Sequence, residues 1–295
     1  MQVLAELGAG KVLEDFPLID NKNEDWKYID LPKDLNDFKT SIGEYYEPSP
    51  RAHIVISDQE YKVLKEHADF EIFDAVTFPS AIIDSYSNRP IDRFIFQQQK
   101  KITSGVIIKT VSSTKEPLVI EIQSSGTNVP YVGMIAEDNI TSSIEFIHTD
   151  SSKGNSYPMI DYKISNNAQI DTYIIYNTPK SSNSITSFYA QIEKDSSLNV
   201  HCSSFSSNLS RIRFDIDLDG IGSNFNIDGV YFGDKNGLID YRVFVNHNVK
   251  NTASNMLLKG ALVDESSSVF TGTIHIAKGA EKTVSHQINR NLILD

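Results

Sequence analysis

Hydrophobic and polar residues alternate along most of the chain after Gly105, as they do in β-strands that bury one face. The clearest example is RIRFDIDLDG, where every second residue from Ile212 to Leu218 is apolar and the residues between are charged. Short stretches rich in Ser, Thr, Asn, Asp and Gly separate such segments, as turns do. No helical spacing is evident between Gly105 and Asp295. This part is therefore predicted to be a β-sandwich, a β-barrel or a β-solenoid.

A weak repeat favours the solenoid. Turns made of small residues recur just before the apolar residues Ile170, Leu198 and Phe225, at steps of 28 and 27 residues. A near-constant period of this size is typical of stacked structural units, in which similar turns lie above one another. Three occurrences are few, so the pattern alone leaves a β-sandwich open.

The N-terminal part has a different pattern. A short apolar run, HIVIS, predicts a strand, and Ser57 followed three residues later by Glu60 resembles a helix capping box. Apolar residues then recur at helical spacing from Tyr61, which predicts a helix. We therefore expect a mixed helical and strand region at residues 1–100 and a mainly β region at residues 101–295.

Composition narrows the class of protein. The 295 residues carry a formal net charge of −12, from 39 acidic and 27 basic side chains, which disfavours a nucleic-acid partner. No run approaches the ~18 apolar residues of a membrane span, and the N-terminus lacks the basic-then-apolar order of a secretion signal. Cys202 is the only cysteine, so no internal disulfide can form. We expect a soluble, cytoplasmic protein without a membrane or nucleic-acid partner.

Two local patterns suggest metal binding but have simpler interpretations. DIDLDG matches the first half of a calcium loop, yet Asn226 stands where the loop needs a bidentate Glu, so we interpret the segment as a strand. His201 and Cys202 are adjacent, and in a strand their side chains point to opposite faces, which prevents joint chelation.

Three further histidines, His247, His275 and His286, lie in polar strand-like segments. Stacked coils can bring distant residues together, so a metal site formed by them stays open, with solvated or hydrogen-bonded histidines as the simpler interpretation. The chain has no nucleophile elbow, zinc-protease helix or nucleotide-binding fingerprint. We therefore expect no catalytic residue, no cofactor and no metal ligand, and a binding or scaffold protein rather than an enzyme.

Two stretches, NEDWKYIDL and SSVFTGTIHIAKGAEKTVSHQINRNLILD, resemble segments of the SufB/SufD family of iron–sulfur cluster assembly proteins, and of SufD in particular. NEDWKYIDL is similar to the N-terminal Glu-x-Trp-Lys-Tyr-x-x-Leu motif of SufD. SSVFTGTIHIAKGAEKTVSHQINRNLILD resembles a Phe-x-Gly-x-Ile strand followed by Ala-Gln-Lys-Thr and Asn-Arg-Asn-Leu-Leu-Leu, with Glu281 replacing a Gln and Ile293 a Leu. Residues 75–240 resemble the family only in their general pattern of short strand-like segments and turns. An upstream His-x-x-x-x-Thr-x-Ser segment is matched by His247, Thr252, Ser254 and Gly260.

The resemblance implies a mainly β fold, a right-handed parallel β-helix with a smaller N-terminal mixed α/β region. It implies a SufD-type scaffold subunit that pairs with a SufB-like protein and a SufC-like ATPase and has no chemistry of its own. The alternatives are a carbohydrate-binding or adhesive β-helix protein, which would be exported, and a degenerate paralogue that only binds partners.

The resemblance also bears on the end of the chain. Family members continue past the position of Asp295 with further coils and a C-terminal helical domain, so we expect a chain cut within the β-helix, either naturally or as a fragment. Whether a SufC-like protein can bind without those helices stays open. An exposed strand edge invites pairing, which predicts a possible homodimer with Phe270 to Leu294 near the contact.

Two expectations concern side-chain directions. Ile288, Leu292 and Leu294 are expected to point into the β-helix. Trp26 and Tyr28 are expected to pack the N-terminal region onto it, because both lie on one face if the segment is extended.

Overall fold

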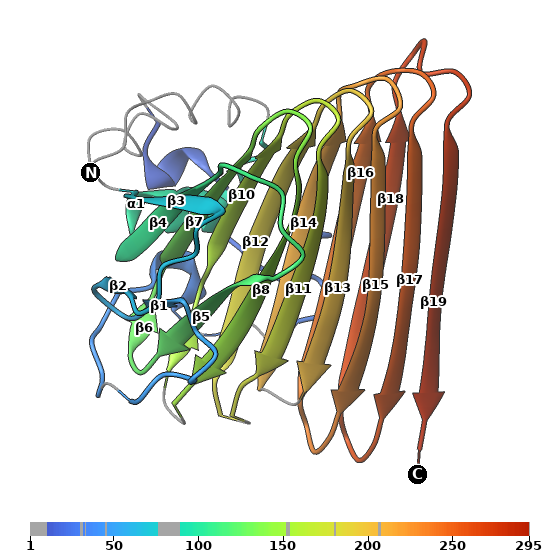
Figure 1. Cartoon of the computed structure of the whole chain (residues 1–295). Coiled ribbons are helices and arrows are strands. Elements are labelled where there is room, and N and C mark those ends of the chain that lie inside the picture. The colour runs from blue at the N-terminus through green and yellow to red at the C-terminus, as the bar shows by residue number, and fades with distance from the viewer. Residues whose placement is uncertain are drawn as a thin grey trace.

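The chain winds as a parallel β-helix whose coils stack side by side toward the C-terminus, in a computed structural model (Figure 1). Each coil gives one strand to each of two sheets, which confirms the predicted fold class. The structure describes residues 11–29, 32, 34–44, 46–75, 89–151, 154–179, 181–205 and 208–294.

The nine-stranded sheet has the strand order β19-β17-β15-β13-β11-β8-β5-β1-β2. Its strands are β1 Ile54–Ile56, β2 Tyr61–Val63, β5 Leu118–Ser124, β8 Thr141–Asp150, β11 Gln169–Asn177, β13 Ser197–Phe205, β15 Asn224–Gly233, β17 Ala253–Leu262 and β19 Val284–Ile293. It faces the viewer in Figure 1.

The ten-stranded sheet has the main path β18-β16-β14-β12-β10-β7-β4-β3, with β6 and β9 beside it. Its strands are β3 Phe70–Asp74, β4 Ser104–Thr110, β6 Thr127–Asn128, β7 Pro130–Ala136, β9 Asn155–Ser156, β10 Met159–Ile164, β12 Asn183–Ile192, β14 Leu209–Leu218, β16 Leu238–His247 and β18 Ser267–Ile276.

The repeat seen in the sequence is the stacking of coils. Ile170 lies beside Leu198, and Leu198 beside Phe225, in parallel register. One corner of the coils repeats a left-handed backbone conformation, which Asn, Asp and Gly adopt more readily than other residues. Its members have positive φ angles: Asn139, Asn167, Asp195, Gly222, Asn251 and Lys282. Backbone hydrogen bonds join neighbouring corners, for example from Asn167 N–H to the Lys194 carbonyl.

The N-terminal region covers the outer face of the ten-stranded sheet. It contains the 3-10 helices η1 (Leu13–Asp15) and η2 (Leu35–Asp37) and the helix α1 (Arg93–Lys100), whose N-cap Asp92 accepts a hydrogen bond from Ile95 N–H at 2.7 Å. Trp26 is only 1% exposed there, in a cluster with Phe94 and Phe38, as the sequence predicted. Among the described residues, no helix is long and apolar enough to cross a membrane.

Tyr28 does not share this role. It is 60% exposed, so the expectation that it helps to attach the N-terminal region is wrong. The segment forms turns instead of an extended strand, as the hydrogen bond from Trp26 N–H to the Asn23 carbonyl shows. Residues two apart therefore need not share a face.

The predicted helix after Ser57 is wrong as well. The segment forms a β-hairpin, in which β1 pairs with β2 in antiparallel register and with β5 in parallel register. The Ser57 hydroxyl donates to the carbonyl of Glu60 across the turn, at 3.0 Å. Ile54 and Ile56 are fully buried, so pairing with the β-helix overrides the local helical pattern.

The last strand faces the opposite way from the prediction. β19 pairs with β17 so that Asn289 aligns with the buried Leu258, while Ile288 aligns with the outward Leu257. Ile288 and Leu292 therefore lie outside, at 42% and 59% exposure. Apolar residues occur at both parities of this strand, so only the register with β17 decides which ones face the lumen.

Candidate functional site

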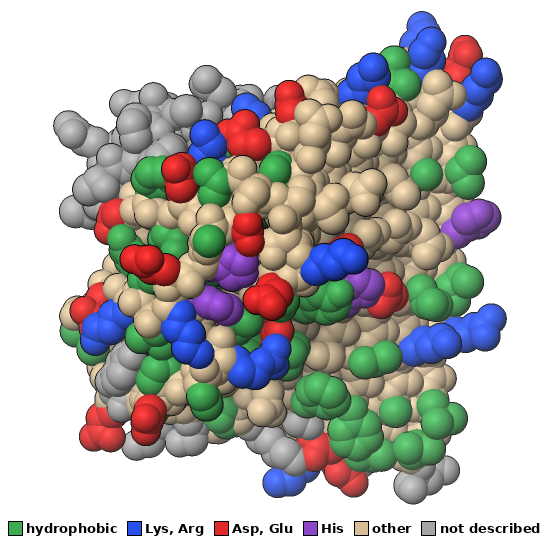
Figure 2. Space-filling view, in the orientation of Figure 1, with side chains coloured by type: hydrophobic (Ala, Val, Ile, Leu, Met, Phe, Trp, Pro, Cys, Tyr) green, Lys and Arg blue, Asp and Glu red, His purple; other side chains and the backbone are tan. Residues whose placement is uncertain are grey.

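Exposed side chains that could contact another molecule gather on two surfaces of the described residues. These are the outer face of the nine-stranded sheet and the edge formed by the last strands. The outer face means the side chains of β8, β11, β13, β15, β17 and β19 that point away from the lumen. Figure 2 shows this face, with hydrophobic side chains gathered at its lower right, over the strands nearest the C-terminus.

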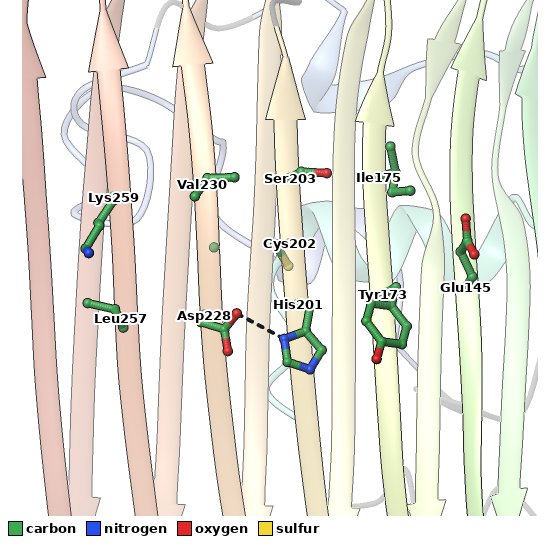
Figure 3. Close-up of a pocket in the computed structure, with 11 residues that line it drawn as sticks. Glu145, Tyr173, Ile175, His201, Cys202, Ser203, Asp228, Val230, Leu257 and Lys259 are labelled. Atoms are coloured by element: carbon green, nitrogen blue, oxygen red, sulfur yellow. Dashed lines mark hydrogen bonds and ion pairs between the residues drawn. The ribbon is translucent and has the colours of Figure 1, made fainter. Parts of the chain in front are cut away.

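A hollow of about 490 Å³ lies on the outer face, over β11, β13, β15 and β17 (Figure 3). Parallel register forms one of its rows, which consists of Tyr173, His201, Asp228 and Leu257. The neighbouring row consists of Ile175, Ser203, Val230 and Lys259. The small side chain of Ser203 sits between two larger apolar ones and leaves room for the depression.

The polar groups of the hollow are arranged around His201. Its Nδ1 lies 3.0 Å from an Asp228 carboxylate oxygen, and its ring stacks on Tyr173 with 4.9 Å between centroids. On the same face, Glu145 accepts a hydrogen bond from Arg51 at 2.5 Å. The His201 and Asp228 side chains are 36% and 56% exposed, so their pairing contributes little to folding. The arrangement can bind a ligand through ring stacking and ionic contacts.

An apolar band runs beside the hollow toward the last strand. It consists of residues in one register row, Phe205, Phe232, Ala261 and Leu292. Phe205 is 46% exposed and Phe232 38%, and Leu292 more so. A contiguous row of exposed apolar side chains is typical of a surface that contacts another molecule.

The edge consists of β18 and β19. Within the part of the chain that the structure describes, β18 pairs with β16 and β19 pairs with β17. Ile276, Val284 and Ile293 are more than half exposed there. The sequence stretch that resembles SufD most closely forms these two strands.

Cys202 and His201 point to opposite faces of β13, as the sequence predicted. Cys202 faces the lumen and is 4% exposed, and burial raises the pKa of its thiol. A neutral, enclosed thiol is a poor nucleophile and a poor metal ligand. Cys202 therefore serves as a core residue beneath the hollow.

The three other histidines do not meet. His247 lies in the lumen, where its Nδ1 is 2.7 Å from the Thr252 hydroxyl and its Nε2 is 3.0 Å from the Ser254 hydroxyl. Burial lowers the pKa of His247, in keeping with a neutral structural ring. His275 and His286 are exposed on different sheets. The described residues contain no group of three or more His, Cys, Asp or Glu side chains that could hold a metal ion.

Sequence reasoning missed a buried ion network on the outside of β14 and β16. Arg211 donates to Asp240 at 2.8 Å, and Arg242 donates to the same carboxylate at 3.1 Å. The Arg211 guanidinium also lies 3.8 Å from the centroid of the Trp26 ring. Burial lowers the pKa of Arg211 to about 10, so it stays charged at neutral pH. This network attaches the N-terminal region to the β-helix.

The same strand settles the DIDLDG motif. Asp215 accepts two hydrogen bonds from Arg213, at 2.8 and 3.1 Å, and Asp217 accepts one from the Tyr189 hydroxyl at 2.7 Å. The motif lies in β14 and the turn after it, as the strand interpretation predicted. The charged residues of the motif lie on a face that other parts of the chain cover. Their alternation with apolar residues in the sequence could not show whether this face is covered or solvated.

The two stacked sheets and the hollow on the outer face define a parallel β-helix protein with a surface that can bind a ligand. Residues 120–295 match the family described as "SUF system FeS cluster assembly, SufBD core domain". This match covers more than half of the chain, so the protein belongs to the SufBD family of iron–sulfur cluster assembly proteins.

Curated relatives agree. The chain is 24% identical over 220 residues to the iron–sulfur cluster assembly SufBD family protein Rv1462 of Mycobacterium tuberculosis (strain ATCC 25618 / H37Rv). The aligned region covers 70% of this chain and 54% of the relative. Identity and coverage are the same for the SufBD family protein Mb1497 of Mycobacterium bovis (strain ATCC BAA-935 / AF2122/97). The chain thus spans about half the length of these relatives.

Proposed function

We propose that the protein is a SufD-type scaffold subunit of iron–sulfur cluster assembly, which pairs with a SufB-like protein and binds a SufC-like ATPase. The observation that carries the proposal is the position of the SufD-like stretch. That stretch forms β18 and β19, and it lies within the residues that match the family model. Family membership through residues 120–295 supports the same role.

In this role the protein contributes binding surface and performs no reaction alone. The cluster is cargo, and it normally needs four ligands, usually cysteine thiolates. This chain has one cysteine, and that thiol is enclosed in the lumen. Anaerobic reconstitution of the isolated chain is therefore expected to give no stable visible-region absorbance. Stoichiometric cluster on the monomer would contradict this.

A homodimer through the same edge is the simplest state of the chain on its own. Free backbone groups on an edge strand pair readily with another edge, and a two-fold contact lets β18 and β19 meet their equivalents. We also propose that the protein is cytoplasmic, where it would meet the SufB-like and SufC-like partners. Residues 1–100 are proposed as an N-terminal mixed helical and strand region, and residues 101–295 as the β-helix region.

The test compares two lysine variants of the 295-residue chain. Ile293→Lys places a charge on the edge strand β19, where the side chain is 74% exposed. Val63→Lys is the matched control, since it is 43% exposed on β2 at the opposite end of the same sheet. Each chain is co-expressed with a SufB-like and a SufC-like protein and purified by a tag on the chain tested.

The wild type and Val63→Lys are expected to retain both partners, and Ile293→Lys to lose the SufB-like one. Sedimentation velocity on the chains alone tests the homodimer separately, with a monomer expected only for Ile293→Lys. Failure of the wild type to retain a SufB-like protein would refute the proposed pairing, and a wild-type monomer at high concentration would refute the dimer.

A further inference from the structure

The lumen of the β-helix is divided into an apolar part and a polar part. The apolar part contains Ile, Leu, Val and Phe side chains from both sheets. The polar part follows the corner where each coil leaves the nine-stranded sheet and enters the ten-stranded one. We call it the polar seam, and it consists of His148, Ser156, Tyr176, Thr178, Ser184, Thr186, Ser204, Ser210 and Tyr241.

Register places the seam residues in two facing rows. On the nine-stranded sheet, His148 lies beside Tyr176, and Tyr176 lies beside Ser204. On the ten-stranded sheet, Ser184 lies between Ser156 and Ser210. Five of these six side chains are 1% exposed or less, and Ser210 is 3% exposed. Polar groups therefore line the corner over several consecutive coils.

Some of these groups satisfy one another across the lumen. The Tyr176 hydroxyl hydrogen-bonds with the Thr186 hydroxyl at 2.5 Å, and Ser204 does so with Tyr241 at 2.6 Å. These bonds show that the two rows face each other at hydrogen-bonding distance. Ser184 lies two residues before Thr186 on the same face of β12, so its hydroxyl opens toward the same corner as Thr178.

The remaining groups of the seam have no partner among the described residues. The hydroxyls of Ser156, Ser184 and Ser210, the hydroxyl of Thr178 and both ring nitrogens of His148 are buried and make no hydrogen bond with that part of the chain. Each such group costs about 1–3 kcal/mol if it stays unpaired. Six of them in one place would outweigh much of the 5–15 kcal/mol by which a typical domain is stable.

Water resolves this conflict, because buried water binds where several polar groups converge and leaves purely apolar space dry. We infer that the polar seam is a binding site for a row of internal water molecules, which hydrogen-bond to Ser156, Ser184, Ser210, Thr178 and His148. His148 also stacks on Tyr176 at 4.1 Å between ring centroids, which fixes the plane of its ring.

The hydration inference predicts the sign of a stability change. In a wet seam, Ser184→Ala and Ser210→Ala each remove a hydrogen bond to bound water, and the unfolding equilibrium constant is expected to rise about fivefold, or about 1 kcal/mol. In a dry lumen the same changes remove an unsatisfied hydroxyl and leave stability equal or higher. Ala190→Ser is the matched control on β12, since Ala190 is fully buried in the apolar part. It is expected to destabilise the protein because its hydroxyl stays dry.

Urea denaturation of the three variants is combined with a direct count of water. Oxygen-17 magnetic relaxation dispersion detects water molecules held inside a protein, and it is expected to show fewer of them in Ser184→Val than in the wild type. Wild-type or greater stability of both Ser-to-Ala variants would overturn the inference. An unchanged count of internal water in Ser184→Val would overturn it as well.

Discussion

Replacing Trp26 by Ala tests how the N-terminal region is held on the β-helix. The Trp26 ring is 1% exposed, lies edge-on to Phe94 at 5.7 Å between centroids and contacts the Arg211 guanidinium. Loss of a buried Trp side chain costs about 3–5 kcal/mol through lost burial and the cavity left behind. The cation–π contact adds about 0.5–2 kcal/mol, because Arg211 loses the ring that covers its charge.

The two contributions together give an expected destabilisation of about 5 kcal/mol. At about 2 °C per kcal/mol for a chain of this size, the melting temperature is expected to fall by about 10 °C. Thermal denaturation is followed by circular dichroism of the sheets. Coils of a solenoid contact mainly their neighbours, so protease cleavage of the N-terminal region is measured in parallel to detect its separate release. Both readouts are expected to respond to Trp26→Ala.

Tyr28→Ala is the control, since Tyr28 is 60% exposed two residues away. It is expected to melt within about 2 °C of the wild type, as surface substitutions usually do. If Trp26→Ala behaved like Tyr28→Ala in both assays, the ring could not be the anchor. The motif would then serve a partner instead of the fold.

Two further predictions concern buried titratable side chains. Asp240→Ala leaves Arg211 and Arg242 buried without their shared carboxylate, and it is expected to lower the free energy of unfolding in urea by about 3–5 kcal/mol. The control, Glu137→Ala, breaks the exposed ion pair with Lys109 at 2.9 Å and is expected to cost under about 1 kcal/mol. Equal losses would refute the role of the network. Burial lowers the pKa of His148 to about 3, so the unfolded state takes up a proton below pH 6.5 that the folded state does not. Stability from this group therefore falls as pH drops from about 6.5 toward 3, by about 2 kcal/mol at pH 5. Denaturation curves should show this loss in the wild type and not in His148→Phe, a variant that keeps an aromatic ring beside Tyr176. Burial raises the pKa of nearby Asp150, so this group changes stability in the opposite direction, equally in both proteins. Identical slopes of stability against pH in the two proteins would contradict the assignment to His148.

The sequence by itself determined where the strands lie, and its weak repeat favoured stacked coils without excluding a β-sandwich. Alternation from Ile212 to Leu218 indicates a strand because residues two apart share a face, and the steps between Ile170, Leu198 and Phe225 match the length of one coil. The sole Trp of the Trp-Lys-Tyr motif was predicted to be buried, and it is. These features follow from local geometry, which depends on neighbours in the chain.

Only the tertiary structure decided which surfaces are covered. Arg211 and Asp215 alternate with apolar residues in the same way as solvated residues would, yet the N-terminal region buries them. The segment after Ser57 carries a helical pattern, but pairing of β1 with β5 draws it into a hairpin. The direction of Ile288 depended on the register between β19 and β17, because a shift of one residue reverses every side chain of a strand. Each of these outcomes rests on contacts between residues far apart in the sequence, and a local pattern of hydrophobic and polar residues carries no information about them.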